Sequence, residues 1–167
     1  MASETFDCIV IGSGPGGYVA AIRSAQLGMS TAVVEKGDIG GRCLNVACIP
    51  AKAMLRSADL LSEIAEAGDF GITVGEPKLD FGAVGERRQK VVSTLTGGVS
   101  MLLKKNKVEV IEGLGSLTAD GKVQVGDRIL EAAKGIVLAT GSVKRPIPGT
   151  EFGGHVIGTE EAWALEA

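Results

Sequence analysis

Two cysteines, Cys43 and Cys48, stand five positions apart in the segment GGRCLNVACIPAK, residues 40–52. Two thiols at this spacing can bind a metal ion, remain separate, form a structural disulfide, or form a disulfide that opens and closes during a reaction. A structural zinc site needs about four ligands. The other candidates are Cys8, within an apolar run, and His155, far along the chain. We therefore expect no metal site.

The surroundings of the pair favour a redox role. The N-terminal residues MASETFDCIVIG lack the basic region and the small-residue cleavage pattern of a secretory leader, so we expect a cytoplasmic protein in a reducing compartment. Closely spaced cysteines in that compartment are more often catalytic or metal-binding than structural. A redox disulfide is the favoured interpretation, and two unpaired buried thiols remain the alternative.

The pair also lies at the start of a predicted helix. Residues five apart in an ideal helix have Cα atoms about 8.6 Å apart, beyond the usual disulfide limit of about 7 Å. A bond between Cys43 and Cys48 thus requires a distorted first turn, which Pro50 favours because it has no N–H for the carbonyl of Val46. A strained disulfide at a helix start is easily reduced, and the helix dipole favours the thiolate. Lys52, four residues after Cys48, is expected on the same helical face.

A glycine-rich turn lies earlier in the chain. Gly12, Gly14 and Gly17 form the pattern G-x-G-x-x-G directly after an apolar strand and at the start of a predicted helix. Such a turn lets backbone N–H groups and a helix N-terminus approach a pyrophosphate. Glu35, eighteen residues after Gly17, could accept hydrogen bonds from a ribose diol and would repel a 2′-phosphate. The pattern predicts FAD or NAD rather than NADP, and a glycine turn without a ligand is the alternative.

The elements that position these residues begin with a β-α-β unit. Strands are predicted over residues 6–11 and 31–35, with a helix over 18–27 between them that ends at Gly28. Two longer helices are predicted over residues 44–67 and 81–106, with Asp80 as the N-cap of the second. The short connections of the first unit imply parallel strands and a right-handed crossover.

The hydrophobic period changes to two after the second long helix. Strand-like pieces cover residues 108–113, 115–119, 122–126 and 128–141, the hairpin signal Asp120-Gly121 lies among them, and the last piece feeds a core strand over 135–139. Thr159 is the expected N-cap of a terminal helix. The order predicts an α/β fold with a central parallel sheet and a small antiparallel β-layer.

Composition excludes several classes of partner. Of the 167 residues 45% are hydrophobic, and 17 basic residues against 20 acidic ones give a net charge of -3 without charged blocks. This balance provides no surface for nucleic acid or an anionic membrane. The chain also has no run of 18 apolar residues, so no membrane partner is expected.

Four motifs together resemble a known family. These are GSGPGG after a strand, VEK at 34–36, GGRCLNVACIPAK at 40–52 and ATGSVKRPIPG at 139–149. Over essentially its whole length the chain resembles the flavin disulfide reductases, and within them most closely the dihydrolipoamide dehydrogenases. Leu44, between the cysteines, favours that branch over the glutathione and mercuric reductases.

The resemblance implies a Rossmann-like FAD-binding domain over about residues 1–150, with residues 151–167 leading toward an NAD-binding domain. That domain and the family's interface domain have no counterpart in these 167 residues, so we expect a piece of a longer protein that is inactive alone. The residues implied to contact the cofactor are Gly12, Gly14, Pro15, Gly16, Gly17, Glu35, Lys36, Gly40, Gly41, Arg42, Cys43, Cys48, Lys52, Gly115, Ala139, Thr140, Gly141 and Ser142.

The family's reaction assigns a role to each cysteine. By resemblance, Cys43 is the outer thiol that meets dihydrolipoamide, and Cys48 passes two electrons to FAD, from which a hydride goes to NAD⁺. The implied partners are a lipoyl carrier of a 2-oxoacid dehydrogenase complex or of the glycine cleavage system, and a second copy in a homodimer. Arg42, Ala47 and Ala51 depart from the family pattern of threonine, glycine and serine or threonine. Arg42 is expected either to pair with the pyrophosphate or to point to solvent.

Three other functions remain as alternatives. The first is a reductase of glutathione, of another small disulfide or of mercuric ion. The second is a truncated flavin-binding module without catalysis. An ordinary NAD-dependent dehydrogenase is the third, and it leaves the cysteine pair unexplained.

Overall fold

The computed structural model describes residues 4–165, and the chain divides into two compact units. The first unit contains the described residues up to Asn45 together with Leu95–Val143, and the second contains Val46–Thr94 and the residues from Lys144 onward. Residues 166–167, part of the predicted terminal helix, lie outside the described range.

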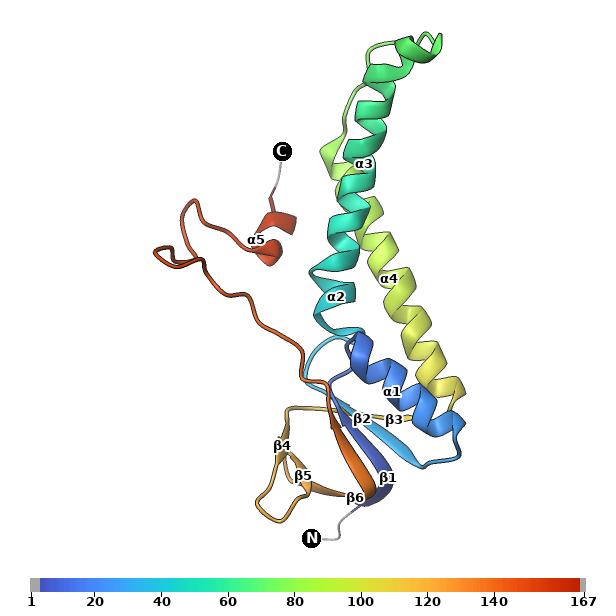
Figure 1. Cartoon of the computed structure of the whole chain (residues 1–167), viewed down its shortest axis with the longest axis vertical. Coiled ribbons are helices and arrows are strands. Elements are labelled where there is room, and N and C mark those ends of the chain that lie inside the picture. The colour runs from blue at the N-terminus through green and yellow to red at the C-terminus, as the bar shows by residue number, and fades with distance from the viewer. Residues whose placement is uncertain (1–3, 166–167) are drawn as a thin grey trace. The chain divides into compact units, whose positions relative to one another are not determined.

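The first unit is built on a mixed six-stranded sheet with the order β3-β2-β1-β6-β5-β4 (Figure 1). Its parallel part confirms the predicted central sheet and joins β1, β2, β3 and β6, and β5 and β4 add an antiparallel edge beyond β6. The strand bounds are β1 Glu4–Ile11, β2 Thr31–Glu35, β3 Glu109–Glu112, β4 Gly115–Leu117, β5 Val123–Val125 and β6 Arg128–Leu138.

The central strands β1 and β2 are buried on both faces over residues 8–11 and 31–34, which explains their continuous apolar runs. Ile9, Ile11 and Val34 belong to a cluster on one face that also takes Val123, Val125 and Leu130 from the antiparallel part. Because side chains alternate along a strand, the buried Val10 lies on the opposite face of the sheet. Helix α1 Pro15–Gln26 packs against β1 and β2 (Figure 1). The predicted β-layer thus contributes buried side chains to the core and does not merely border it.

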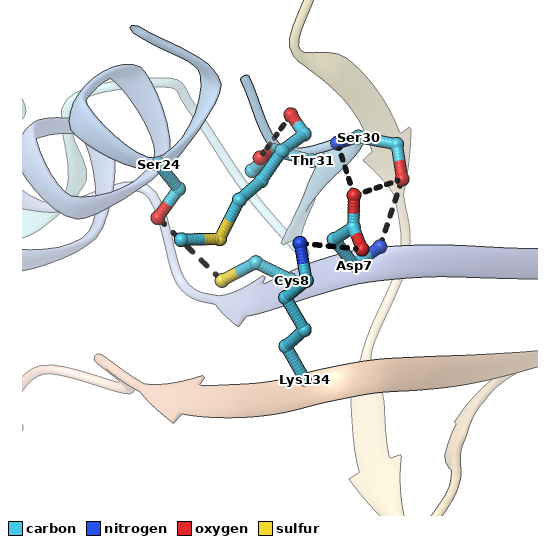
Figure 2. A network of polar contacts seen from close by, with 7 residues as sticks. Asp7, Cys8, Ser24, Ser30, Thr31 and Lys134 are labelled. Carbon is cyan, nitrogen blue, oxygen red and sulfur yellow. Dashed lines mark hydrogen bonds and ion pairs between the residues drawn. The ribbon is translucent and has the colours of Figure 1, made fainter. Parts of the chain in front are cut away.

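The start of β1 is fixed by a polar network around Asp7 (Figure 2). Ser30 donates to Asp7 Oδ2 from its backbone N–H at 2.9 Å and from its hydroxyl at 3.2 Å, while Lys134 Nζ lies 3.1 Å from Oδ1. The hydroxyl of Ser24 donates to the sulfur of the buried Cys8 at 3.7 Å. These contacts join β1 to β6 and to the turn that follows α1, and the side chain of Cys8 is buried in the core.

Helix α1 begins at Pro15, three residues before its predicted start, with Gly14 as its N-cap. Proline suits the first turn because its missing N–H is unneeded there and its φ angle is already helical. The glycine turn is therefore shorter than expected, and its last glycine, Gly17, lies within the helix.

The prediction of one continuous helix over residues 44–67 is wrong. The chain forms α2 Gly41–Asn45, which belongs to the first unit, and then α3 Cys48–Glu66, followed by the 3₁₀ turn η1 Ala67–Phe70. Ala47 has φ −121° and ψ −93°, outside the helical region, so the helix is interrupted between the two cysteines. Pro50 explains the interruption, because it cannot donate a hydrogen bond to the preceding turn.

The remaining helices are α4 Phe81–Lys105 and α5 Thr159–Trp163. Asp80 Oδ1 accepts the backbone N–H of Ala83 at 2.9 Å, which confirms the predicted N-cap of α4. The predicted N-cap Thr159 is wrong, because Gly158 occupies that position and its N–H donates to the side chain of Glu161 at 2.9 Å. Among the described residues no helix is both long and apolar enough to cross a membrane.

Candidate cofactor and redox site

The glycine turn after β1 packs against the end of β6 without room for side chains. Gly12 has φ +99°, and a Cβ atom there would lie 2.2 Å from the carbonyl oxygen of Ala139. A Cβ atom on Gly17 would lie 1.8 Å from the carbonyl oxygen of Gly12. Both positions therefore require glycine, the first also for its backbone conformation. The result is a tight turn that brings bare backbone to the N-terminus of α1.

A second glycine pair closes over this turn. Gly41 has φ +59°, and a Cβ atom there would lie 2.7 Å from the Cα atom of Gly14. The N–H of Gly40 donates to the carbonyl oxygen of Ser13 at 3.1 Å and approaches the Ser13 hydroxyl at 3.3 Å. Two segments with glycine-rich sequences thus meet in space at the carboxyl end of the parallel strands, where ligands of open α/β sheets bind.

Glu35 at the end of β2 is held by the same turn. Its Oε2 atom accepts the N–H of Ser13 at 2.8 Å and the Ser13 hydroxyl at 2.6 Å, and its Oε1 atom accepts the N–H of Gly37 at 3.0 Å. Burial raises the pKa of the Glu35 carboxyl, but these hydrogen bonds outweigh it and leave the pKa below its ordinary value. The side chain is therefore an ionised acceptor at neutral pH, with lone pairs left for a diol.

Further predicted residues lie around the same edge of the first unit. The N–H of Ala139 donates to the carbonyl of Ile11 at 2.8 Å, and Thr140, Gly141 and Ser142 continue as an exposed segment after β6. A Cβ atom on Gly115 would lie 3.0 Å from the side chain of Val34. Lys36 follows Glu35 and is exposed.

The cysteines occupy consecutive helices. Arg42 and Cys43 lie in α2 and are half-buried, and the turn before α2 is braced by Asn45, whose side chain donates to the carbonyls of Ile39 and Gly41 at 3.0 and 2.9 Å. Cys48 is the first residue of the 19-residue helix α3 and is exposed. The Cys48 thiol therefore lies at the N-terminus of α3, where solvent and a reaction partner can reach it.

Two of the predicted site residues, Cys48 and Lys52, belong to the second unit. Lys52 lies on α3 one helical turn after Cys48, and it is exposed. The four-residue spacing in the sequence already predicted that Cys48 and Lys52 lie on the same face of the helix. Among the described residues no three or more His, Cys, Asp or Glu side chains are grouped in a way that could hold a metal ion.

Sequence reasoning missed two residues that organise the site. Ser13, fully buried, connects the glycine turn both to Glu35 and to Gly40. Asn45 fixes the glycine pair ahead of Cys43. A small polar residue between two glycines was the available signal for Ser13, whereas nothing in the local pattern around Asn45 indicated its backbone contacts.

Comparison with known proteins decides the family. The family model described as pyridine nucleotide-disulphide oxidoreductase matches residues 6–167, nearly the whole chain. The chain belongs to this family. The resemblance inferred from the motifs is confirmed, and so is the Rossmann-like fold that it implied.

Relatives within the family share more than two fifths of their aligned residues with this chain. The dihydrolipoyl dehydrogenase of Chlamydia muridarum is 43% identical over 152 residues, which is 90% of this chain and 33% of that protein. The dihydrolipoyl dehydrogenase of Bacillus subtilis is 41% identical over 181 residues, 99% of this chain and 38% of the relative. The dihydrolipoyl dehydrogenase of Manduca sexta is 47% identical over 153 residues, which is 87% of this chain and 30% of that protein. The chain thus spans about a third of the length of these relatives.

Proposed function

We propose that this chain is the FAD-binding segment of a dihydrolipoamide dehydrogenase, in which Cys43 and Cys48 form the redox disulfide. Residues up to about 150 form part of the FAD-binding domain, and residues 151–167 lead toward an NAD-binding domain. The observation that carries the proposal is the interruption between α2 and α3, which sets the two cysteines of a family member on separate helices. A regular helix would hold them too far apart to bond.

The residues of the first unit fit FAD. Gly12, Gly17 and Gly41 form a cradle that Cβ atoms would fill, at the N-terminus of α1, and a pyrophosphate suits such a cradle. Glu35 is ionised and offers acceptors to the adenosine ribose. The remaining residues that we assign to this cofactor are Gly14, Pro15, Gly16, Lys36, Gly40, Arg42, Cys43, Cys48, Lys52, Gly115, Ala139, Thr140, Gly141 and Ser142.

The cysteines carry out a thiol–disulfide exchange. One thiolate of dihydrolipoamide attacks the sulfur of Cys43, forming a mixed disulfide and releasing Cys48 as the leaving thiolate. The second thiol of the substrate loses its proton to solvent or a base and closes the lipoamide disulfide, releasing Cys43. The substrate is oxidised by two electrons and the cysteine pair is reduced by two. The chemistry that FAD supplies when bound is transfer of these electrons to NAD⁺.

Lipoyl groups are the substrates that the proposal requires, carried by a 2-oxoacid dehydrogenase complex or by the glycine cleavage system, and the full-length protein is expected to be a homodimer. The support for this substrate class is that relatives at 41–47% identity are dihydrolipoyl dehydrogenases. Glutathione with NADPH is the comparison substrate, because a related reductase would prefer it.

The test is steady-state NAD⁺ reduction by the full-length protein with dihydrolipoamide. We expect turnover that disappears in Cys43→Ser and in Cys48→Ser, since neither variant can close the disulfide. Flavin content is measured in parallel, so that loss of the cofactor is not mistaken for loss of chemistry. Absence of lipoamide-dependent turnover in the flavin-loaded wild type, or a preference for glutathione with NADPH, would contradict the proposal.

A further inference from the structure

The interruption between the two cysteines leaves one backbone carbonyl without its helical donor. In a continuous helix the carbonyl of Val46 would accept the N–H of residue 50, but that residue is Pro50. The next pair is intact, since Ala51 N–H donates to Ala47 at 3.0 Å. Ala47, the N-cap of α3, makes no side-chain cap. The carbonyl of Val46, unlike that of Ala47, is therefore not bound by a backbone N–H of α3.

Trp163 supplies the missing donor from 117 residues further along the chain. Its indole Nε1–H donates to the carbonyl oxygen of Val46 at 2.8 Å. The same tryptophan is held by Arg88 of α4, whose Nη1 atom donates to the Trp163 carbonyl at 2.9 Å and whose guanidinium lies 5.8 Å from the ring centroid. All three residues belong to the second unit. We call this group of Val46, Arg88 and Trp163 the indole clamp.

The helix that presents Trp163 is itself fixed. Glu161 accepts the N–H of Gly158 at 2.9 Å and forms an ion pair with Lys144, which also lies 4.8 Å from the ring centroid of Phe152. The ion pair with Lys144 lowers the pKa of the Glu161 carboxyl, so this contact persists at neutral pH. A helix of five residues has little stability of its own, and these contacts hold its tryptophan in place.

We propose that Trp163 is a positioning residue for the redox pair. Its indole N–H takes the place of the N–H that Pro50 lacks. The bond restrains Val46 and Ala47, the two residues that connect α2, which contains Cys43, to Cys48. This inference rests on the proposed function of the cysteines and adds a residue to it. A restraint on Val46 and Ala47 limits the freedom of the open dithiol. It therefore raises the effective concentration of one thiol near the other and favours closure of the disulfide.

Trp163→Phe tests the restraint, because it keeps an aromatic ring and removes only the donor. The Cys43–Cys48 equilibrium is measured in the full-length protein with dithiothreitol redox buffers, by thiol alkylation and mass spectrometry. We expect the constant for disulfide formation to fall about two- to tenfold, the range that one hydrogen bond contributes to an equilibrium. A tenfold change corresponds to about 30 mV. Arg56→Lys, in the exposed pair with Glu63 on the same helix, is the control and should leave the constant unchanged.

A second measurement follows the indole N–H of Trp163 in the wild-type protein itself. In wild-type protein labelled with ¹⁵N-tryptophan, the indole cross-peak of Trp163, assigned by its absence from Trp163→Phe, should exchange slowly with deuterated solvent. It should shift when the cysteine pair is reduced and stay in place in the Cys43→Ser, Cys48→Ser double variant. Rapid exchange of this proton, or a peak indifferent to the redox state, would overturn the inference.

The outcomes separate this inference from the proposed function. A wild type that forms no Cys43–Cys48 disulfide refutes the proposed function and the inference with it. A wild type that forms the disulfide, with an equal or larger constant in Trp163→Phe, refutes the role of Trp163 alone.

Discussion

Replacing Gly17 by alanine tests the packing of the glycine turn. The added Cβ atom would lie 1.8 Å from the carbonyl oxygen of Gly12, 2.8 Å from its carbon and 3.3 Å from the Cβ atom of Ala139. A carbon atom needs roughly 3.5 Å from its neighbours, so helix and turn must separate by about 1.5 Å. The turn is not free to move, because the N–H of Gly12 donates to Val34 of the next strand at 2.8 Å.

The expected cost is at the upper end of the overpacking range, about 3 kcal/mol of unfolding free energy, because backbone rather than flexible side chains must give way. That is a roughly hundredfold loss in the folding constant. Gly16→Ala is the matched control, one residue away in the same helix. A Cβ atom on Gly16 meets nothing within 4 Å, and alanine in a helix is favoured over glycine by up to about 1 kcal/mol.

Urea denaturation of the full-length protein, followed by circular dichroism, measures both variants, and flavin absorbance after gel filtration reports cofactor retention. We expect Gly17→Ala to lose flavin and stability, and Gly16→Ala to match or exceed the stability of the wild type. A Gly17→Ala protein within about 1 kcal/mol of the wild type, or two variants equally destabilised, would refute the reasoning.

Three further perturbations follow from contacts in the first unit. Ser13→Ala removes a hydrogen bond that keeps the pKa of Glu35 below its ordinary 4.5, so the pKa measured by carbon NMR should rise; an unchanged value would contradict the assignment. Hydrogen bonds from Ser30 and the charge of Lys134 lower the pKa of Asp7, so its contribution to stability is complete above its ordinary 3.8 and is lost as pH falls through the lower folded value. Asp7→Asn should therefore flatten the acid dependence of the urea midpoint in that range, and an equally steep dependence would refute this. Gly115→Ala should cost about 1 kcal/mol in urea denaturation because its Cβ atom would lie 3.0 Å from Val34, and equal stability would show that the neighbours yield freely.

Local patterns predicted the parts of the fold that depend on local chemistry. The β-branched runs over residues 9–11 and 31–34 are buried parts of β1 and β2, the Asp120-Gly121 signal lies in the turn between β4 and β5, and Asp80 caps α4. Each of these follows from residues close together in sequence. The four motifs GSGPGG, VEK, GGRCLNVACIPAK and ATGSVKRPIPG together indicated the family.

Long-range contacts explain what sequence reasoning missed. The hydrogen bond from Trp163 to Val46 spans 117 residues and has no local signature. The interruption at Ala47 was anticipated only as a distorted turn, because a proline shows which donor is missing but not where the chain bends. Ser13 was passed over since its partners, Glu35 and Gly40, lie in other segments.

The central claim is that Cys43 and Cys48 exchange electrons between a lipoyl dithiol and FAD. Its most direct test is the visible spectrum of the full-length protein, recorded anaerobically before and after adding dihydrolipoamide. We expect a flavin band that gains a long-wavelength charge-transfer shoulder on reduction, with no such shoulder in Cys48→Ser. A protein without a flavin band, or a wild-type spectrum that dihydrolipoamide leaves unchanged, would contradict it.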